Sequence, residues 1–330
     1  MTLFLDRRAA LIRAVTFSAA LAATLGLHAG AHAQAPANPT ELRIGFQKYG
    51  TLTVLKAKGD LEKRLAPLGI TVKWTEFPAG PQLLEGLNVG SIDFGTVGEA
   101  PPIFAQAAGA DLVYVANQPP APAAEALIVP KESPVRTLAD LKGRKVVLNK
   151  GSNVHYLLVK LLEKQGLKYS DIQVVYLPPA DARAAFERGA VDAWVIWDPF
   201  LAAAERQLGA RVIADGKGVV ANHQFYLAAR GYAEKHPQVV QAIVDELARL
   251  DRWSEANTAA VAALLAPQIG LDVATTELAA ARFAYGIQPI TPVIAAEQQK
   301  IADAFHALKL IPKPIRIADA LPKSVRTAAK

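Results

Sequence analysis

The feature that most limits what this chain can fold into is an alternation of short β-rich runs and helical segments that occurs twice. In the first half, strands are predicted at residues 42–46, 71–77 and 91–97, with helices at 51–65 and 81–88. In the second half, strands are predicted at 145–148, 173–177 and 190–197, with helices at 153–165 and 181–188. Such alternation is typical of parallel sheets covered by helices, so we predict an α/β fold with two similar halves.

Short motifs repeat in register with these elements. Gly90-Ser91-Ile92-Asp93 is echoed by Gly189-Ala190-Val191-Asp192, and in both the glycine suits the left-handed position that ends a helix. Glu99-Ala100-Pro101 is matched by Asp198-Pro199, an acid beside a proline that suits the first helical turn. The opening strands end in Gln47-Lys48 and in Asn149-Lys150. Three echoes in register indicate an internal duplication.

The N-terminal segment has the pattern of an export signal. Arg7, Arg8 and Arg13 precede an uncharged run over residues 14–27, which the small-residue sequence Ala31-His32-Ala33 follows. We predict that residues 1–33 are a signal peptide cleaved after Ala33. A retained membrane anchor is the alternative, although the run is shorter than the roughly 20 residues that a membrane span needs.

Composition narrows the possible chemistry. The 330 residues are 52% hydrophobic and include no cysteine, which indicates one or two globular domains and excludes thiol catalysis and cysteine-bound metal centres. The net charge of +6 comes from 36 basic and 30 acidic residues without a concentrated patch, so we expect no nucleic-acid partner.

The common catalytic motifs are missing from the sequence. It contains no phosphate-binding G-x-x-x-x-G-K-[ST], no G-x-S-x-G, no H-E-x-x-H and no G-x-G-x-x-G. Histidines at positions 155, 223, 236 and 306 have no spacing that suits a metal pair on one helix. We therefore predict a binding protein rather than an enzyme, with no cofactor and no metal.

A ligand site is predicted where loops follow the carboxyl ends of the parallel strands. If the two halves face each other, these loops meet in one cleft, and they contain Gln47, Gly98, Glu99, Ser152, Asn153, Trp197 and Asp198. The helix that begins at Asn153 offers free N–H groups and the positive end of its dipole, with Ser152 as the candidate N-cap, and so predicts an anion site.

Each of these residues also has a purely structural interpretation. Ser152 can serve only as a helix cap, and Glu99 and Asp198 can complement helix dipoles or hold a hinge. Trp197 is either a core residue or a cover for the apolar part of a ligand. His155 and His223 are interpreted first as buried structural histidines.

Several longer segments resemble the aliphatic-sulfonate-binding periplasmic proteins of ABC importers, within the sulfonate, taurine and nitrate group. They are Phe77-Pro78-Ala79-Gly80-Pro81-Gln82-Leu83-Leu84, the stretches over residues 90–95 and 99–109, Asn149-Lys150-Gly151-Ser152-Asn153-Val154-His155 and Trp197-Asp198-Pro199-Phe200. The resemblance covers residues 42 to about 236.

This resemblance implies a type II periplasmic binding fold of two α/β lobes with the ligand cleft between them. Lobe 1 would comprise residues 41–125 and 226–330, lobe 2 residues 126–225, with crossings near 125–129 and 222–226. The family's ligand-contact positions match Gln47, Gly98, Glu99, Ser152, Asn153, His155, Trp197 and Asp198.

The function implied is capture of aliphatic sulfonates (alkanesulfonates) in the periplasm for import as a sulfur source. The protein would be a monomer that delivers its ligand to a membrane permease served by a separate ATPase. Taurine, nitrate or a pyrimidine cofactor precursor remain alternative ligands, and a precursor-processing enzyme or a sensory protein remain alternative functions. The sequence leaves the preferred chain length, the affinity and the permease open.

Overall fold

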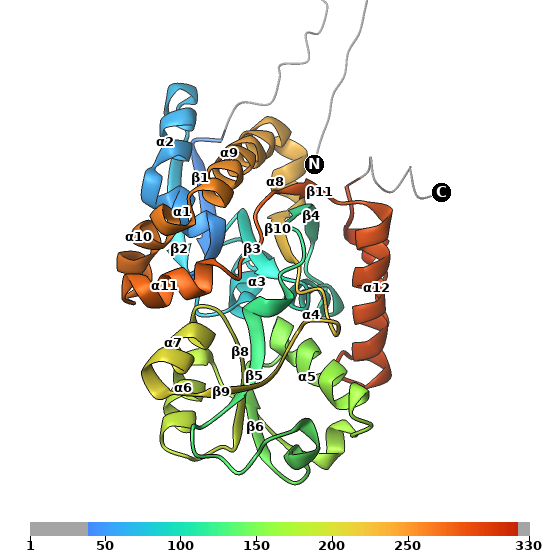
Figure 1. Cartoon of the computed structure of the whole chain (residues 1–330). Coiled ribbons are helices and arrows are strands. Elements are labelled where there is room, and N and C mark those ends of the chain that lie inside the picture. Colours follow the sequence, from blue (N-terminus) through green and yellow to red (C-terminus); the bar gives the residue numbers. More distant parts are fainter. Residues whose placement is uncertain (1–38, 323–330) are drawn as a thin grey trace, which may run out of the picture. The chain divides into compact units, whose positions relative to one another are not determined.

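The computed structural model describes residues 39–322, which form two β-sheets flanked by helices (Figure 1). The predicted signal peptide lies outside the described residues. We call the six-stranded sheet and its helices lobe 1, and the five-stranded sheet and its helices lobe 2. The α/β fold predicted from the alternation of elements is confirmed.

Lobe 1 is built on a sheet of strand order β11-β4-β10-β3-β1-β2. Its strands are β1 (Glu41–Phe46), β2 (Thr71–Glu76), β3 (Phe94–Gly98), β4 (Leu112–Asn117), β10 (Gln224–Ala229) and β11 (Gln288–Pro289). Its helices are α1 (Gly50–Lys58), α2 (Asp60–Leu65), α3 (Gly80–Asn88), α4 (Pro101–Ala107), α8 (Arg230–Lys235), α9 (Pro237–Ala256), α10 (Thr258–Ile269), α11 (Val273–Ala280) and α12 (Pro292–Ala307).

Lobe 2 is built on a sheet of strand order β7-β6-β8-β5-β9. Its strands are β5 (Glu125–Val129), β6 (Lys145–Leu148), β7 (Gln173–Tyr176), β8 (Ala193–Trp197) and β9 (Arg211–Asp215). Its helices are α5 (Asn153–Lys164), α6 (Pro179–Glu187) and α7 (Phe200–Leu208). The chain passes from the first sheet to the second between β4 and β5 and returns between β9 and β10.

The two sheets share one topology. In each, three parallel strands are ordered β2-β1-β3 or β7-β6-β8, and an antiparallel strand follows, β10 in lobe 1 and β5 in lobe 2. Each of these antiparallel strands lies beside a connection between the lobes. Their equivalent places strengthen the interpretation of an internal duplication.

The aspartate of the repeated Gly-x-x-Asp motif makes the same backbone hydrogen bonds in both lobes. Asp93 accepts from the backbone N–H of Arg43 at 2.9 Å, and Asp192 accepts from that of Lys145 at 2.8 Å. In return the N–H of Asp93 donates to the carbonyl of Arg43 (2.8 Å), and that of Asp192 to Lys145 (2.9 Å). Each aspartate thus ties the start of its own strand to the first parallel strand of its lobe, a contact that needs a carboxylate at this spacing.

The glycine of the same motif has the predicted conformation. Gly90 has φ +73° and Gly189 has φ +67°, values in the left-handed region that side chains disfavour. A second such glycine corrects one prediction, because Gly59 (φ +63°) divides the single helix expected at 51–65 into α1 and α2. The third strand also starts later than predicted, at Phe94, since residues 90–93 form the turn.

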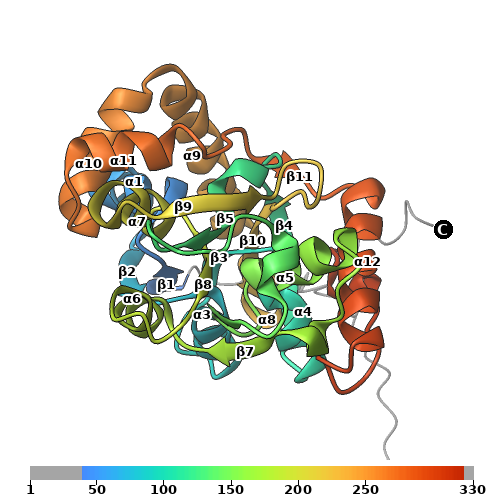
Figure 2. The ribbon, with the colours of Figure 1, turned by 60° about the horizontal axis from the view of Figure 1, so that its bottom comes forward.

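Apolar packing covers both faces of each sheet. In lobe 1, α1, α9 and α10 contribute to the core cluster around Leu42, Ile44 and Tyr226, whereas α3, α4 and α12 pack on the side of Phe225 and Leu227. In lobe 2, α5 covers one face, and α6 and α7 cover the other. Figures 1 and 2 both show α12 beside α5, where Phe305 contacts Tyr156 at a ring-centroid distance of 5.8 Å.

Within residues 39–322, no single helix has the length and apolar character to cross a bilayer. The pair α10 and α11 passes that test only when taken together, and it is bent by 118°.

Candidate ligand site

Two small adjoining cavities lie where the carboxyl ends of strands from the two lobes meet. The inner cavity has a volume of about 20 Å³ and the side cavity about 30 Å³, and Tyr49, Trp197 and Gln224 line both. The inner cavity is further lined by Gln47, Gly80, Gly98, Pro101, Ser152 and Asn153. The side cavity is further lined by Gly50, Thr51, Gln118, Pro119, Ala121, Ala124, Asp198, Asn222, Phe283, Ala284 and Tyr285.

Three helices direct their N-termini to these cavities. The helices α1, α3 and α5 begin at Gly50, Gly80 and Asn153, and each of these residues lines one of the two cavities. None of the three helices has a side-chain hydrogen bond at its N-cap. The first N–H groups of a helix have no partner within it, so this arrangement gathers backbone donors and three positive dipole ends around the two adjoining cavities.

Ser152 occupies the predicted N-cap position of α5 but does not cap the helix. Its hydroxyl donates to the carbonyl of Asn149 at 2.6 Å. The side chain therefore fixes the turn that precedes α5, and the N–H groups of the first helical turn are left without a side-chain acceptor. The hydrogen-bond donors available at this helix terminus are therefore backbone N–H groups.

Asn153 is held by the segment that returns from lobe 2 to lobe 1. Its amide donates to the side-chain oxygen of Asn222, and Asn222 in turn donates to the carbonyl of Ala121 at 2.8 Å. Asn222 has φ +54°, a left-handed conformation that asparagine tolerates better than most residues. The return connection thus contacts the N-terminus of α5 directly, and the outward connection is linked to it through Asn222.

Gln47 begins a buried polar chain along one wall of the inner cavity. Its amide donates to the carbonyl of Thr96 at 3.1 Å and reaches the hydroxyl of Tyr49 at 3.4 Å. That hydroxyl donates to Gln224 at 2.7 Å. The chain joins the ends of β1, β3 and β10, so these three polar side chains are fixed before any ligand binds.

Trp197 and Asp198 bring the end of β8 to the same place. Trp197 is partly exposed and lines both cavities, whereas Asp198 is 2% exposed and accepts from the N–H of Ala202 at 3.0 Å. Burial raises the pKa of Asp198 to about 7, against the opposing effect of the nearby Arg282 guanidinium. The raised pKa favours the neutral carboxyl, which weakens its repulsion of an anion.

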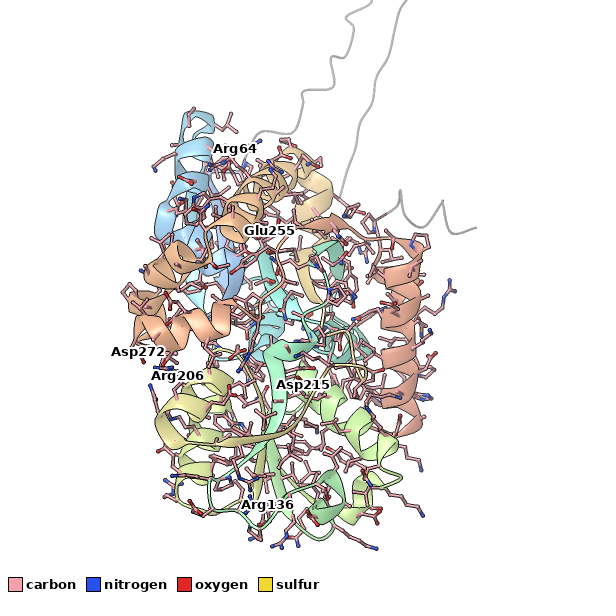
Figure 3. All side chains as sticks on the ribbon, in the orientation of Figure 1. Arg64, Arg136, Arg206, Asp215, Glu255 and Asp272 are labelled. Carbon is pink, nitrogen blue, oxygen red and sulfur yellow. The ribbon has the colours of Figure 1, made fainter. Side chains whose placement is uncertain are left out.

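Arg282 links the two lobes beside the side cavity. This residue follows α11 of lobe 1 and contacts two acids of lobe 2, Glu205 at 2.6 Å and Asp198 at 3.4 Å. Nearby, Figure 3 shows Arg206 of α7 close to Asp272, the N-cap residue of α11. The positive charge of Arg206 contributes to lowering the pKa of Asp272, after the hydrogen bonds that Thr275 donates to this carboxylate.

Glu99 lies outside the two cavities, on the other side of the lobe connections. Its carboxylate accepts from the N–H of His223 at 3.0 Å and lines a separate cavity of about 360 Å³ with Glu297 and Tyr156. Burial raises its pKa to about 7. Glu125 is also fully buried nearby, and its burial raises its pKa as well. This arrangement favours the hinge interpretation of Glu99 over direct ligand contact.

His155 is also a buried structural residue, and it lines neither cavity. It is 0% exposed, its Nδ1 accepts from the N–H of Gly151 at 3.2 Å, and its Nε2 is 2.8 Å from the hydroxyl of Tyr169. Phe104 of lobe 1 stacks on the ring at a centroid distance of 6.0 Å. Burial lowers the pKa of His155 to about 3, so the imidazole is neutral at physiological pH.

Of the eight predicted residues, six line the two cavities, and Glu99 and His155 do not. Sequence reasoning missed Tyr49, Gly80, Asn222, Gln224 and the segment 283–285. A signal was present for Gly80, because Gly80-Pro81 opens a helix after a predicted strand. For Gln224 and Phe283 there was none, because only tertiary contacts bring them to the ends of β1 and β8.

No lysine, arginine or histidine appears among the described residues that line the inner and side cavities. Residues 39–322 also contain no group of three or more His, Asp or Glu side chains arranged to hold a metal ion. The site thus offers neutral donors, aromatic surface and one buried carboxyl.

Two lobes of matching topology and a cavity lined from both of them define a substrate-binding protein of the type II periplasmic binding fold. The chain belongs to the NMT1-like family, whose family model matches residues 35–267.

Comparison with individual proteins shows which proteins of known name this chain is similar to. The chain is 48% identical over 286 residues to an Escherichia coli protein named for binding aliphatic sulfonates, covering 86% of this chain and 89% of that one. The structure of the alkanesulfonate-binding protein SsuA from Xanthomonas axonopodis pv. citri, bound to MOPS, matches with a TM-score of 0.82 and 44% identity, covering 87% of this chain and 99% of that one. The periplasmic aliphatic sulphonate binding protein SsuA from Escherichia coli matches with a TM-score of 0.78 and 46% identity, covering 87% and 93%.

Proposed function

We propose that this protein is the periplasmic substrate-binding component of an ABC importer and captures aliphatic sulfonates, the alkanesulfonates, as a source of sulfur. The observation that carries the proposal is that three helix N-termini without side-chain caps lie at two adjoining cavities, whose described lining residues include no cation. The relatives named for the same ligand class support it.

A sulfonate suits neutral donors because it carries one delocalised negative charge and accepts no proton near neutral pH. Backbone N–H groups at Gly80 and Asn153, which line the inner cavity, would contact its oxygens, and the N-terminus of α1 at Gly50 lies at the adjoining side cavity. Each hydrogen bond to such a charge contributes about 1.5–3 kcal/mol, and micromolar affinity requires about 8 kcal/mol. Four bonds of this kind together with burial of a short tail reach that value after the cost of ordering the ligand.

The apolar part of the ligand would lie against aromatic rings. Trp197 borders both cavities, and Tyr49 and Phe283 face each other at a ring-centroid distance of 6.3 Å along the side cavity. We place the sulfonate group in the inner cavity and the carbon chain toward the side cavity. The residues proposed to hold the ligand are Gln47, Gly98, Ser152, Asn153, Trp197 and Asp198, joined by Tyr49, Gly80 and Gln224.

Both lobes contribute residues to the lining of the proposed ligand site, and this explains how binding would be coupled to closure and transport. A ligand that contacts lobe 1 through α1 and α3, and lobe 2 through α5, makes all of its contacts only when the lobes are closed, so it shifts the population toward closure. The closed protein would dock on a membrane permease with a separate ATPase. Export directed by the predicted signal peptide would deliver the protein to the periplasm. There it would act as a monomer.

We propose binding without catalysis. The hydroxyl of Ser152 donates to a backbone carbonyl, and both ring nitrogens of His155 have partners away from the two cavities. Ser152 is therefore not paired with a general base, and His155 is not directed at a nucleophile in the cavities. The relatives reported above are named as binding proteins, which supports the same conclusion.

The test is a titration of tryptophan fluorescence with ligand-free protein in a buffer that contains no sulfonate. MOPS in particular must be avoided, because a relative was solved with it bound. Ethanesulfonate and butanesulfonate should bind with micromolar affinity, and sulfate should not. A response only to nitrate, to taurine or to a pyrimidine would assign the alternative ligand. Trp197→Phe should remove most of the signal change, with Trp253→Phe as the matched control.

A further inference from the structure

The side cavity and a much larger groove lie on opposite faces of one thin wall. The groove, which we call the outer groove, has a volume of about 560 Å³ and runs over residues 120–126, α7 and β9. Ala121, Phe283 and Ala284 line both the side cavity and the outer groove. A wall one residue thick therefore separates a volume of about 30 Å³ from one of about 560 Å³.

Phe283 is the large side chain in that wall. Its ring packs against Tyr49 inside the side cavity, and its neighbour Arg282 bonds to Glu205 and Asp198 of lobe 2. Arg282 is a positioning residue in this respect, because its bridge ties the wall segment to the lobe that closes on the ligand. The other two residues shared by both faces, Ala121 and Ala284, are too small to block the passage.

The outer groove has the surface that an apolar chain requires. Proline, alanine, valine and leucine side chains form much of its lining, among them Pro122, Leu201 and Val212. Charged residues such as Asp215 and Lys217 also line it. Val212 is 42% exposed on the edge strand β9, and it would be covered by a chain lying in the groove.

We propose that Phe283 determines the longest sulfonate tail that the protein accepts, and that the outer groove is a subsite for longer tails once this ring is removed or displaced. This inference rests on the proposed function. The side cavity would hold the first carbons of the tail, and the Phe283 ring would stop it there. Short alkanesulfonates would then be preferred over long ones.

The experiment measures binding of ethane-, butane-, hexane- and octanesulfonate to the wild-type protein and to Phe283→Ala. Burial of each methylene group strengthens binding about fourfold. In the wild-type protein this gain should stop at the length that reaches Phe283. In Phe283→Ala it should continue, so that the ratio of octanesulfonate to ethanesulfonate affinity rises at least tenfold.

Three further variants make the result decisive. Phe186→Ala removes the same side chain from α6 at a position that lines neither the side cavity nor the outer groove, and its length profile should match wild type. Adding Val212→Glu to Phe283→Ala should cancel the gain for octanesulfonate and leave ethanesulfonate unchanged. If Phe283→Ala fails to fold, Phe283→Leu opens the wall partly and should shift the profile in the same direction.

The outcomes separate the two proposals. An identical length profile in wild type, Phe283→Ala and Phe186→Ala would overturn the role of Phe283 while sulfonate binding itself stands. Absence of binding by every sulfonate to the wild-type protein would instead overturn the proposed function.

Discussion

The backbone of Gly98 lies so close to the side chain of Asn153 that a Cβ atom at position 98 would overlap the asparagine amide. Gly98 ends β3 of lobe 1, and Asn153 begins α5 of lobe 2. The absence of a side chain at one position thus allows the two lobes to approach at the inner cavity. Gly98 thus leaves room for the side chain of Asn153, in addition to any ligand contact of its own.

Gly98→Ala should destabilise the closed arrangement because the added methyl group must displace Asn153. Such overpacking costs about 1–3 kcal/mol, and the Asn153–Asn222 bond would be lost as well. Binding of ethanesulfonate should weaken at least tenfold, measured by titration. Gly231→Ala is the control, since no atom lies within 4 Å of a Cβ there. If Asn153→Ala does not restore stability to Gly98→Ala in urea unfolding, the overlap is not the cause.

The double variant Ser152→Ala with Asn153→Ala should weaken sulfonate binding by about 1–3 kcal/mol. It removes the hydroxyl that fixes the turn before α5 and the amide that joins this helix to Asn222. Calorimetric titration gives the affinity, and circular dichroism at increasing temperature shows whether the fold is retained. Wild-type affinity in the folded double variant would remove the α5 terminus from the proposed site.

Arg282→Met should weaken ligand binding about tenfold. The change leaves Asp198, which is 2% exposed, without its cationic partner and removes the bridge between the lobes. Arg183→Met is the matched control, because its exposed ion pair with Glu187 is expected to contribute less than about 1 kcal/mol. Small-angle scattering with and without ligand would show whether closure is affected, and equal affinities of the two variants would contradict the bridge.

The contribution of Glu99 to the free energy of unfolding should decrease as pH rises from about 4.5 to 7. Burial raises its pKa to about 7 in the folded protein, so over this range the folded state holds a proton that the unfolded chain releases. Below pH 4.5 both states are protonated and above pH 7 both are ionised, so the contribution is then constant. Glu99→Gln removes it.

The comparison of Tm between pH 5 and pH 8 for wild type and Glu99→Gln isolates this contribution from other titrating groups. Wild type should lose more stability than the variant as pH rises. Parallel Tm curves for the two proteins would show that Glu99 is ionised in the folded state at pH 5.

His155 should remain neutral from pH 5 to pH 8, because burial lowers its pKa to about 3. Its effect on stability has the opposite sign to that of Glu99. As pH falls below about 6.5 the unfolded chain takes up a proton that the folded ring refuses, so stability decreases. Histidine NMR resonances followed over this range should include one that does not shift. A His155 resonance that titrates near pH 6.5 would place the ring in contact with solvent.

The sequence by itself determined the class of fold and six of the residues that line the two cavities. Local periodicity placed strands and helices to within a few residues, as for β6 and α5, because hydrophobic patterning and helix-ending glycines act over short distances. The repeated Gly-x-x-Asp motif indicated two similar halves. The rule that ligands bind beyond the carboxyl ends of parallel strands then selected Gln47, Ser152 and Trp197.

Only the tertiary structure decided on which side of the segments that connect the lobes each predicted site residue lies. Glu99 and Asp198 occupy matching positions in the two repeats, yet Asp198 lines the side cavity and Glu99 lines another cavity behind the connecting segments. The direction of each side chain depends on contacts with residues more than 80 positions away, Arg282 for Asp198 and His223 for Glu99. Phe283 came to the site for the same reason, because packing between distant segments leaves no local pattern in the sequence.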